Sequence, residues 1–463
     1  MISPSTINEL TRIVGRDNIY TSKEERITYS YDATNRAFLP DAVLFPENTQ
    51  QISLILKMAN FEGIPIVPRG AGSGTVGGAL PVEGGVVLTL ERMNRILKID
   101  TENLIAVVEP GVVTGDLQLE VEKMGLFYPP DPTSLKFSTI GGNVAQCAGG
   151  PRAVKYGVTR DYVLGLEVVL PTGKIINTGV ETLKGVVGYD LTRLFVGSEG
   201  TLGIITKVIL KLLPLPEEVR TMLAIFPDTR DAAITVSEII SSRMLPSTLE
   251  FMDNHCIRCV EEYLKIGLPQ DVEALLLIEV DGDETLVERQ IEAVKDLCLK
   301  NHATDVRIAR DKAEVKDLWR ARRAIPPALA RIKPHKINED VVVPRSKIPE
   351  LLAGIKEVGK LYNLIIANFG HAGDGNIHVN VMLDRANPEE VSGAEKSVEE
   401  IFRLVIKLGG TLSGEHGVGI TKAPYIGMEL SPDVIKVMKG IKQVLDPNRI
   451  MNPGKVFLEG SSQ

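Results

Sequence analysis

Apolar positions in the first half of the chain come in short runs separated by Gly and Pro, a pattern typical of β-strands. Two stretches instead carry apolar residues at helical spacing, 49–62 and 117–124, the second ending at Gly125. The first 35 or so residues predict a helix and a turn-rich lead-in. The strands are predicted at 42–45, 64–68, 86–90, 105–108, 164–170 and 204–210.

Beyond Pro214–Glu218, which has the composition of a boundary, the pattern changes. Strands and amphipathic helices now alternate, as in an α+β or α/β layer. The strands are predicted at 221–226, 273–280, 339–343 and 377–383, and the helices at 229–241, 284–299 and 432–445. A chain of 463 residues is longer than one hydrophobic core usually supports. We therefore expect domains at 1–216 and 217–425 and a C-terminal segment at 426–463.

Composition narrows the function classes. The net charge of −8 argues against a nucleic-acid-binding protein, which usually carries a basic surplus. The apolar runs are too short to span a bilayer, and the N-terminus lacks the features of a signal peptide. We therefore expect a cytoplasmic protein without a transmembrane segment, with membrane association through a partner left open.

The four cysteines do not form an iron–sulfur or zinc motif. Cys256 and Cys259 form one C-x-x-C pair in a stretch with helical spacing, which also includes Phe251. We interpret them as two small residues on a helix face rather than a redox pair.

A glycine-rich loop, Pro68–Pro81, follows the strand predicted at 64–68. Gly72, Gly74 and Gly77 match the G-x-G-x-x-G pattern of dinucleotide-binding folds, but that pattern is informative only when a helix opens on it. Pro81 and another strand follow here instead, so the Rossmann context fails. Glycines can still bring backbone N–H groups close to an anion, which favours a phosphate-binding loop over a bare glycine-rich hairpin.

Two further glycine-rich blocks, Ile140–Gly150 and Gly197–Gly203, lie in the same half of the chain. Three such blocks suggest a large, extended ligand lying along the backbone. At this point the sequence resembles the PCMH-type (vanillyl-alcohol-oxidase-like) FAD-binding family, near its glycolate oxidase flavin subunit, D-lactate dehydrogenase and D-2-hydroxyglutarate dehydrogenase branch. The resemblance runs from about Asp41 to Phe457.

The resemblance implies an α+β fold: a PCMH-type FAD-binding domain, an α+β substrate (cap) domain with an antiparallel sheet, and a C-terminal helical segment returning to the FAD domain. It implies FAD, which we expect to be non-covalent because no His precedes His255 and Cys147 lies outside the phosphate loop. The residues implied for the cofactor are Pro68, Arg69, Gly70, Ala71, Gly72, Ser73, Gly74, Gly77, Pro132, Thr133, Gly141, Gly142, Asn143, Gly149, Tyr156, Gly157, Glu199, Gly203, Ile204 and Asn452.

Three of the six histidines fall in two short glycine-rich motifs, 368–380 and 413–419. Strand alternation places His378 and Asn380 on one face, and the Gly-Asp-Gly turn after His371 could fold that residue back toward them. Two imidazoles and the carboxylate of Glu415 form a common ligand set for a catalytic divalent metal, whereas a lone core histidine would be structural.

The resemblance assigns roles within this group. It implies His371, His378 and Glu415 as metal ligands, with zinc, manganese and iron all open. It implies Asn380 as a substrate contact and His416 as the catalytic base. Hydride transfer from C2 and removal of the C2 proton by His416 are both compatible with the sequence.

An anionic substrate also needs a cation. Arg322 matches the family's carboxylate-binding arginine, although from the residues alone a solvated helix face is the better interpretation. Pro326 stands where the hydroxyglutarate enzymes have Thr, and Asn338 lies nearer than Lys336 to their substrate lysine. These departures favour glycolate or D-lactate over D-2-hydroxyglutarate.

Two other interpretations stay open: a metal-dependent hydrolase with structural glycine loops, and a non-catalytic flavin-carrying scaffold subunit. If the chain is the dehydrogenase, electrons must leave to an external acceptor. We expect a partner such as an iron–sulfur subunit, an electron-transferring flavoprotein or a quinone-linked carrier.

Overall fold

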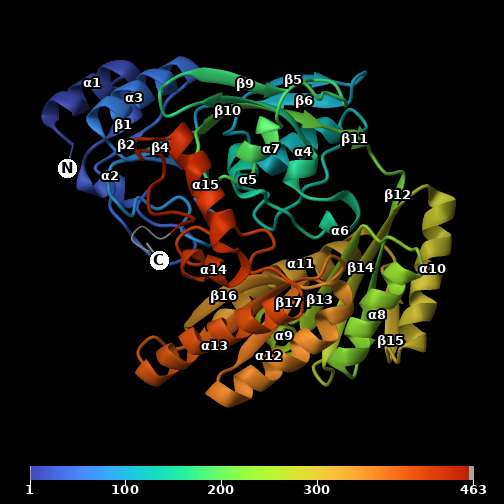
Figure 1. The fold of residues 1–463 in the computed structure, drawn as a ribbon. Helices are drawn as coiled ribbons and strands as arrows, with labels where there is room; N and C mark the ends of the chain where they lie inside the picture. Colours follow the sequence, from blue (N-terminus) through green and yellow to red (C-terminus); the bar gives the residue numbers. More distant parts are fainter. Residues whose placement is uncertain (1, 458–463) are drawn as a thin grey trace. The chain divides into compact units, whose positions relative to one another are not determined.

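The computed structural model describes residues 2–457, and Figure 1 labels its elements in chain order. The chain forms two compact units. Within the described residues, unit 1 comprises 2–148, 158–215 and 415–457, and unit 2 comprises 149–157 and 216–414. The polypeptide therefore passes between the units four times. Within the described residues, no helix combines the length and apolar character that a membrane span requires.

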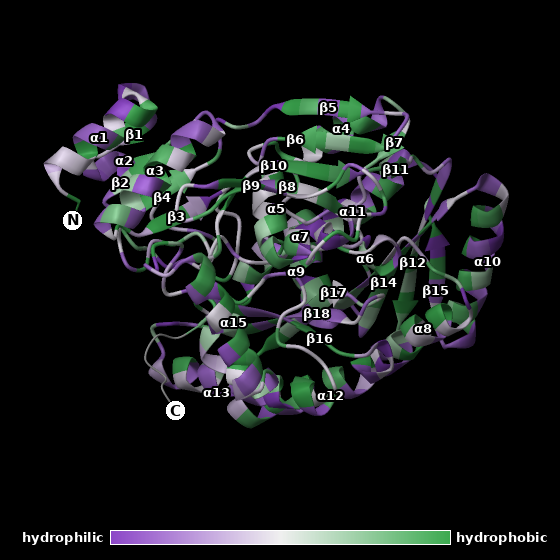
Figure 2. Ribbon diagram, turned by 45° about the horizontal axis from the view of Figure 1, so that its top comes forward, coloured by the Kyte–Doolittle hydropathy of each residue, from purple (hydrophilic) through white to green (hydrophobic). Residues whose placement is uncertain are grey.

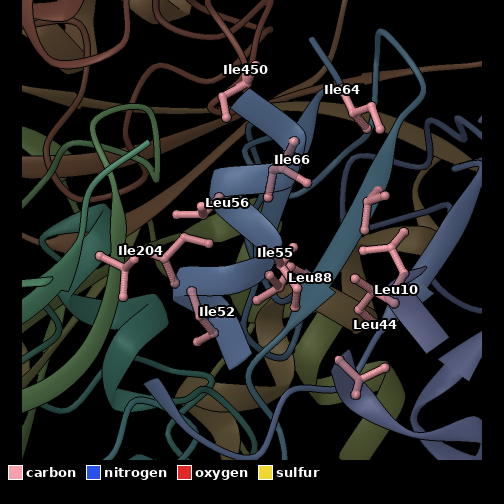
Figure 3. Packing of buried hydrophobic residues seen from close by; sticks show 14 of the residues in the cluster. Leu10, Leu44, Ile52, Ile55, Leu56, Ile64, Ile66, Leu88, Ile204 and Ile450 are labelled. Carbon is pink, nitrogen blue, oxygen red and sulfur yellow. The ribbon is translucent and has the colours of Figure 1, made fainter. Parts of the chain in front are cut away.

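Unit 1 begins with a four-stranded sheet in the order β1-β2-β4-β3. Its strands are β1 (Ile19–Tyr20), β2 (Ala42–Leu44), β4 (Val86–Thr89) and β3 (Ile66–Arg69), with helices α1 (Pro4–Val14) and α3 (Thr49–Glu62) beside them. Figure 3 shows apolar side chains of α3 and the strands meeting in one core, which also receives Ile450 and Met451 from the end of the chain. The bounds of α3 match the predicted helix.

A second sheet of unit 1 is antiparallel, with the order β5-β6-β10-β8-β9. Its strands are β5 (Ile96–Asp100), β6 (Ile105–Val108), β10 (Ile204–Lys211), β8 (Val163–Val169) and β9 (Ile175–Gly179). The helices of this unit include α4 (Thr114–Glu122), α5 (Ile140–Gln146), α7 (Leu191–Phe195) and α15 (Pro432–Leu445). The prediction of a helix over 432–445 is confirmed.

Unit 2 is built on a seven-stranded sheet in the order β15-β12-β14-β13-β17-β18-β16, with every neighbouring pair antiparallel. Its strands are β15 (Asp305–Ile308), β12 (Glu218–Phe226), β14 (Ala274–Gly282), β13 (Thr248–Asp253), β17 (Ile366–His371), β18 (Asn376–Leu383) and β16 (His335–Val342). The expected α+β class and antiparallel cap sheet are therefore confirmed.

Helices cover both faces of this sheet. Residues of α9 (Asn254–Leu264) and α11 (Lys312–Ala328) share a core with Leu223, Met252 and Phe369 on one face. Elements α8 (Thr229–Ser241), α10 (Glu284–Lys300), α12 (Ile348–Tyr362) and α13 (Pro388–Lys407) pack against its strands as well. Figure 2 shows hydrophobic and hydrophilic residues sharing each of these helices, as expected for helices that cover a sheet.

One helix was not predicted, and one residue was predicted on the wrong element. The glycine-rich block at 140–150 begins with helix α5, which the Thr139 hydroxyl caps by accepting the Gly142 N–H. Phe251 lies on β13 rather than on the predicted helix, which starts three residues later at Asn254. Cys256 and Cys259 are buried free thiols of α9, in agreement with the helix-face interpretation.

Candidate functional site

A row of polar side chains crosses one face of the unit 2 sheet. His378 stands opposite Phe369 on β17 and Asp340 on β16, and Asn380 stands opposite Asn338. Directly paired residues of antiparallel strands point to the same face, so His378 and Asn380 share the face that β17 and β16 present with them. The predicted alternation along β18 is confirmed.

His371 ends β17, and the turn at 372–375 brings the chain back into β18. The Asp374 carboxylate accepts the Asn376 N–H at 3.2 Å within this turn. As a result, Nε2 of His371 lies 3.4 Å from Nε2 of His378, with the two rings nearly perpendicular at 85°. The hairpin thus brings both predicted imidazole ligands together.

Glu415 directly follows Gly414, whose N–H donates to the Asp340 backbone carbonyl at 3.0 Å and to its carboxylate at 2.9 Å. His371, His378 and Glu415 each offer one ligand atom, and these atoms lie within 4.8 Å of one another. Two imidazole nitrogens and one carboxylate oxygen are a ligand set suited to a catalytic divalent metal. The residues therefore fit the predicted metal.

Behind His371 lies a buried ion cluster. Oε1 of Glu250, on β13, is 2.6 Å from Nδ1 of His371, and Oε2 accepts Nε of Arg322 at 2.5 Å. Burial by itself raises the pKa of Glu250, but the charges of Arg322 and His371 outweigh that effect and lower it. Arg322 is buried rather than solvated, so the interpretation of its helix face as solvent-exposed is wrong.

Asn380 donates its Nδ2 to the carbonyls of Ala367 and His378, at 3.3 and 3.2 Å. Its Oδ1 and that of Asn338 are buried, and within the described part of the chain neither has a hydrogen-bond partner. Buried polar atoms of this kind normally have one, so two vacant acceptors beside the histidines fit contacts to a bound ligand. Lys336 lies farther along β16 and donates to the Pro326 carbonyl at 3.3 Å.

The loop at Pro68–Pro81 runs from the end of β3 without entering a helix, which confirms that the Rossmann context is absent. A Cβ on Gly70 would lie 2.5 Å from the Thr139 hydroxyl, and one on Gly72 would lie 2.1 Å from Nη2 of Arg69. At Gly74 the same position meets nothing within 4 Å. The lack of a side chain thus allows close packing at Gly70 and Gly72, whereas Gly74 faces open space.

Two polar side-chain atoms of this loop, Nη1 of Arg69 and Oγ1 of Thr75, are buried without a hydrogen-bond partner in residues 2–457. Donors of both kinds bind phosphate oxygens in proteins. The open space at Gly74 and these two donors fit the predicted pyrophosphate of FAD.

Glu199 and Asn452 hold parts of unit 1 together. The Glu199 carboxylate accepts the N–H groups of Val418 and Gly419, both at 2.8 Å, just after His416. Asn452 donates to the carbonyls of Gly78 and Glu199, at 2.8 and 2.7 Å. Both side chains, predicted as cofactor contacts, therefore also fix the backbone of the glycine loop and of the segment that carries His416.

Three predicted cofactor residues, Gly149, Tyr156 and Gly157, lie in the short segment that groups with unit 2. There the Tyr156 hydroxyl donates to Oδ2 of Asp281 at 2.8 Å, and Lys155 forms an ion pair with the same carboxylate. The remaining predicted cofactor residues all lie in unit 1: Pro132, Thr133, Gly141, Gly142, Asn143, Gly203 and Ile204.

Among these, Asn143 and Gly141 show why their residue types matter locally. Asn143 is buried and donates to the Thr114 hydroxyl at 2.7 Å. A Cβ on Gly141 would lie 2.5 Å from the Pro110 side chain. Each has a structural role in addition to the one predicted.

Glu250 was absent from the predicted site. The sequence feature that could have indicated it is the alternation of apolar and polar residues at Leu249, Glu250 and Phe251, in a segment where we predicted no strand. A second buried carboxylate, Glu279 on β14, was missed as well. It accepts the Thr221 hydroxyl and the Trp319 indole N–H, both at 2.7 Å.

Comparisons with known proteins agree with this picture. The family described as "FAD linked oxidases, C-terminal domain" matches residues 215–456, and the family described as "FAD binding domain" matches residues 40–179. The glycolate oxidase subunit GlcD of Bacillus subtilis (strain 168) is 50% identical over 458 residues, covering 99% of this chain and 97% of that protein. A D-lactate dehydrogenase of Anaerostipes hadrus is 40% identical, covering 90% of this chain and 89% of its own.

A solved structure, that of p-cresol methylhydroxylase with substrate bound, superposes with a TM-score of 0.81. It covers 99% of this chain and 98% of that one at 20% identity, which supports the fold alone. The domain matches and the near full-length similarity to the two relatives establish the family. The chain belongs to the FAD-linked oxidases, with a PCMH-type FAD-binding domain, and is an oxidoreductase of that family.

Proposed function

We propose that this protein oxidises a small D-2-hydroxy acid, with glycolate or D-lactate favoured, to the corresponding 2-oxo acid. The observation that carries the proposal is the meeting of His371, His378 and Glu415 in a chain similar throughout its length to a glycolate oxidase subunit. A second relative, named D-lactate dehydrogenase, supports the same substrate class.

The proposed cofactors are non-covalent FAD and one divalent metal. When bound, FAD supplies a two-electron acceptor, and the metal supplies a Lewis acid that lowers the pKa of the substrate hydroxyl. The loop at Pro68–Pro81 would hold the FAD pyrophosphate, and His371, His378 and Glu415 would hold the metal.

The other residues of unit 2 would bind and orient the substrate. Oδ1 of Asn380 offers an acceptor for the substrate hydroxyl, and Arg322 offers positive charge for the carboxylate. Since Nε and Nη2 of Arg322 already contact Glu250, we propose that its remaining donors serve the substrate. His416, next to Glu415 in the chain, would take a proton from the substrate as general base.

Electrons would then pass to a separate acceptor. The four cysteines, at positions 147, 256, 259 and 298, do not have the spacing of an iron–sulfur motif, so we propose that the electrons leave to a separate protein. Several relatives are named as subunits, which supports a partner protein in the reaction. We propose an iron–sulfur subunit or an electron-transferring flavoprotein for that role.

A substrate screen tests the proposal. The purified yellow protein is assayed with D- and L-2-hydroxy acids and an artificial dye acceptor, before and after treatment with a chelator. We expect turnover of glycolate or D-lactate that falls on chelation and returns with added Mn²⁺ or Zn²⁺. Turnover indifferent to thorough chelation would remove the metal from the mechanism, and a colourless protein would remove the flavin.

A matched pair of variants tests the base. His416→Ala should lose turnover while keeping bound flavin, whereas His302→Ala, at an exposed position of unit 2, should keep both. Unchanged turnover in His416→Ala would contradict the proposed role of this residue.

A further inference from the structure

Glu250 contacts two residues with proposed roles in the reaction. Its Oε1 lies 2.6 Å from Nδ1 of His371, and its Oε2 lies 2.5 Å from both Nε and Nη2 of Arg322. All three side chains are almost inaccessible to solvent, with exposures of 0% for Glu250 and 3% for each of its partners. One carboxylate therefore joins a candidate metal ligand to a candidate substrate cation.

The chemistry of these contacts fixes the orientation of the His371 ring. Because a guanidinium has donors only, Oε2 of Glu250 must act as an acceptor toward Arg322. The charged partner favours a carboxylate, whose Oε1 then accepts the N–H on Nδ1 of His371. A hydrogen on Nδ1 leaves the lone pair on Nε2, the atom 3.4 Å from Nε2 of His378.

We infer that Glu250 is a positioning residue, which orients His371 toward the metal and holds Arg322 beside it. The inference rests on the proposed metal site. Carboxylates that accept the second nitrogen of a ligating histidine commonly set its tautomer and raise metal affinity. Here the same carboxylate also neutralises an arginine that would otherwise be a buried, unpaired charge.

The fold offers a matched control on the neighbouring strand. Glu279 of β14 is also buried, and its Cα stands opposite Thr248, two residues before Glu250 on β13. It also anchors helix α11, through Trp319 rather than Arg322. Its partners Thr221 and Trp319 are not proposed ligands, so Glu279→Gln removes a buried carboxylate without touching His371.

The experiment measures metal affinity rather than turnover. Full-length, FAD-loaded wild type, Glu250→Gln, Glu250→Asp and Glu279→Gln are stripped of metal and titrated with Mn²⁺ by calorimetry. The visible absorption bands of Co²⁺ report the ligand geometry in parallel. Thermal unfolding and retained flavin absorbance show that each variant is folded, and Glu250→Asp keeps the charge in case Glu250→Gln does not fold.

We expect both Glu250 variants to bind Mn²⁺ about 10- to 100-fold more weakly than wild type, with altered Co²⁺ bands. Glu279→Gln should lower thermal stability but keep the wild-type Mn²⁺ affinity and Co²⁺ spectrum. Wild-type Mn²⁺ affinity in the Glu250 variants, or an equal loss in Glu279→Gln, would overturn the positioning role alone. A wild-type protein that binds none of Mn²⁺, Co²⁺ or Zn²⁺ would overturn the proposed metal site itself.

Discussion

Replacing Gly74 by alanine separates FAD binding from folding. The φ angle of Gly74 lies outside the left-handed region, and an added Cβ would meet nothing within 4 Å. The folded protein should therefore accept the methyl group without strain. Restricting the unfolded chain would even stabilise the apoprotein, by about 0.4–1 kcal/mol.

Bound FAD changes that expectation. If the pyrophosphate lies on the backbone of 70–74, the new methyl group occupies space that the phosphates need. Loss of one charge-assisted hydrogen bond from a backbone N–H costs about 1.5–3 kcal/mol. The FAD dissociation constant should accordingly rise about 10- to 100-fold.

Quenching of flavin fluorescence on titration of the apoprotein measures the affinity, and thermal unfolding of the apoprotein measures the stability. Gly63→Ala serves as the control, because Gly63 caps α3 with a φ of 68° and also has nothing within 4 Å of its added Cβ. That variant should lose stability and keep FAD affinity. Wild-type FAD affinity in Gly74→Ala would refute the placement of the pyrophosphate. A clear loss of apoprotein stability in the same variant would refute the statement that an added Cβ at this position meets no other atom.

Three further changes have defined outcomes. Gly72→Ala combines a φ of 68° with a Cβ 2.1 Å from Nη2 of Arg69, so it should destabilise the apoprotein by about 1–3 kcal/mol in thermal unfolding. Leu56→Ala, in the core of unit 1, should cost about 2–5 kcal/mol in urea unfolding, and a loss below 1 kcal/mol would contradict the packing in Figure 3. Burial lowers the pKa of Lys455 from 10.5 to about 8, outweighing nearby carboxylates such as Glu199. Between those pH values the unfolded chain binds more protons than the folded chain, so the free energy of unfolding, compared with that of Lys455→Met, should rise by about 3 kcal/mol as the pH increases. A difference between the two proteins that does not change with pH would contradict the burial of Lys455.

The elements predicted most accurately are helices that bury one face, because their apolar residues then recur with a clear period along the sequence. The helices at 49–62, 229–241 and 432–445 have the predicted bounds because their apolar residues recur at helical spacing. The strand that carries His378 and the turn after His371 were also predicted, since strand alternation and a glycine turn are local properties, whereas β17 itself was not. These features depend on few distant contacts.

The missed residues depend on tertiary partners. A glutamate between two apolar residues, as at Glu250, is normally the solvent-facing position of a strand, and Arg322 is normally a solvated helix residue. Each is buried because the other is present, 72 positions apart in the chain. Helix α5 was missed for a related reason, since Gly141 and Gly142 are poor helix formers and the close approach of Pro110 requires the first of them.

Ile450 and Met451, near the C-terminus, belong to the hydrophobic core that is otherwise formed mainly by the first hundred residues. The Ile66 N–H donates to the Ile450 carbonyl at 2.7 Å, and the Asn452 N–H donates to the Ile66 carbonyl at 2.8 Å. During synthesis on the ribosome, residues 216–414 emerge complete before this closure is available, so we expect unit 2 to fold while unit 1 is still open. Nascent chains arrested shortly before Ile450 should accordingly be cleaved by protease within unit 1 and protected within unit 2. Unit 1, although first to be translated, would be the last to acquire its native stability.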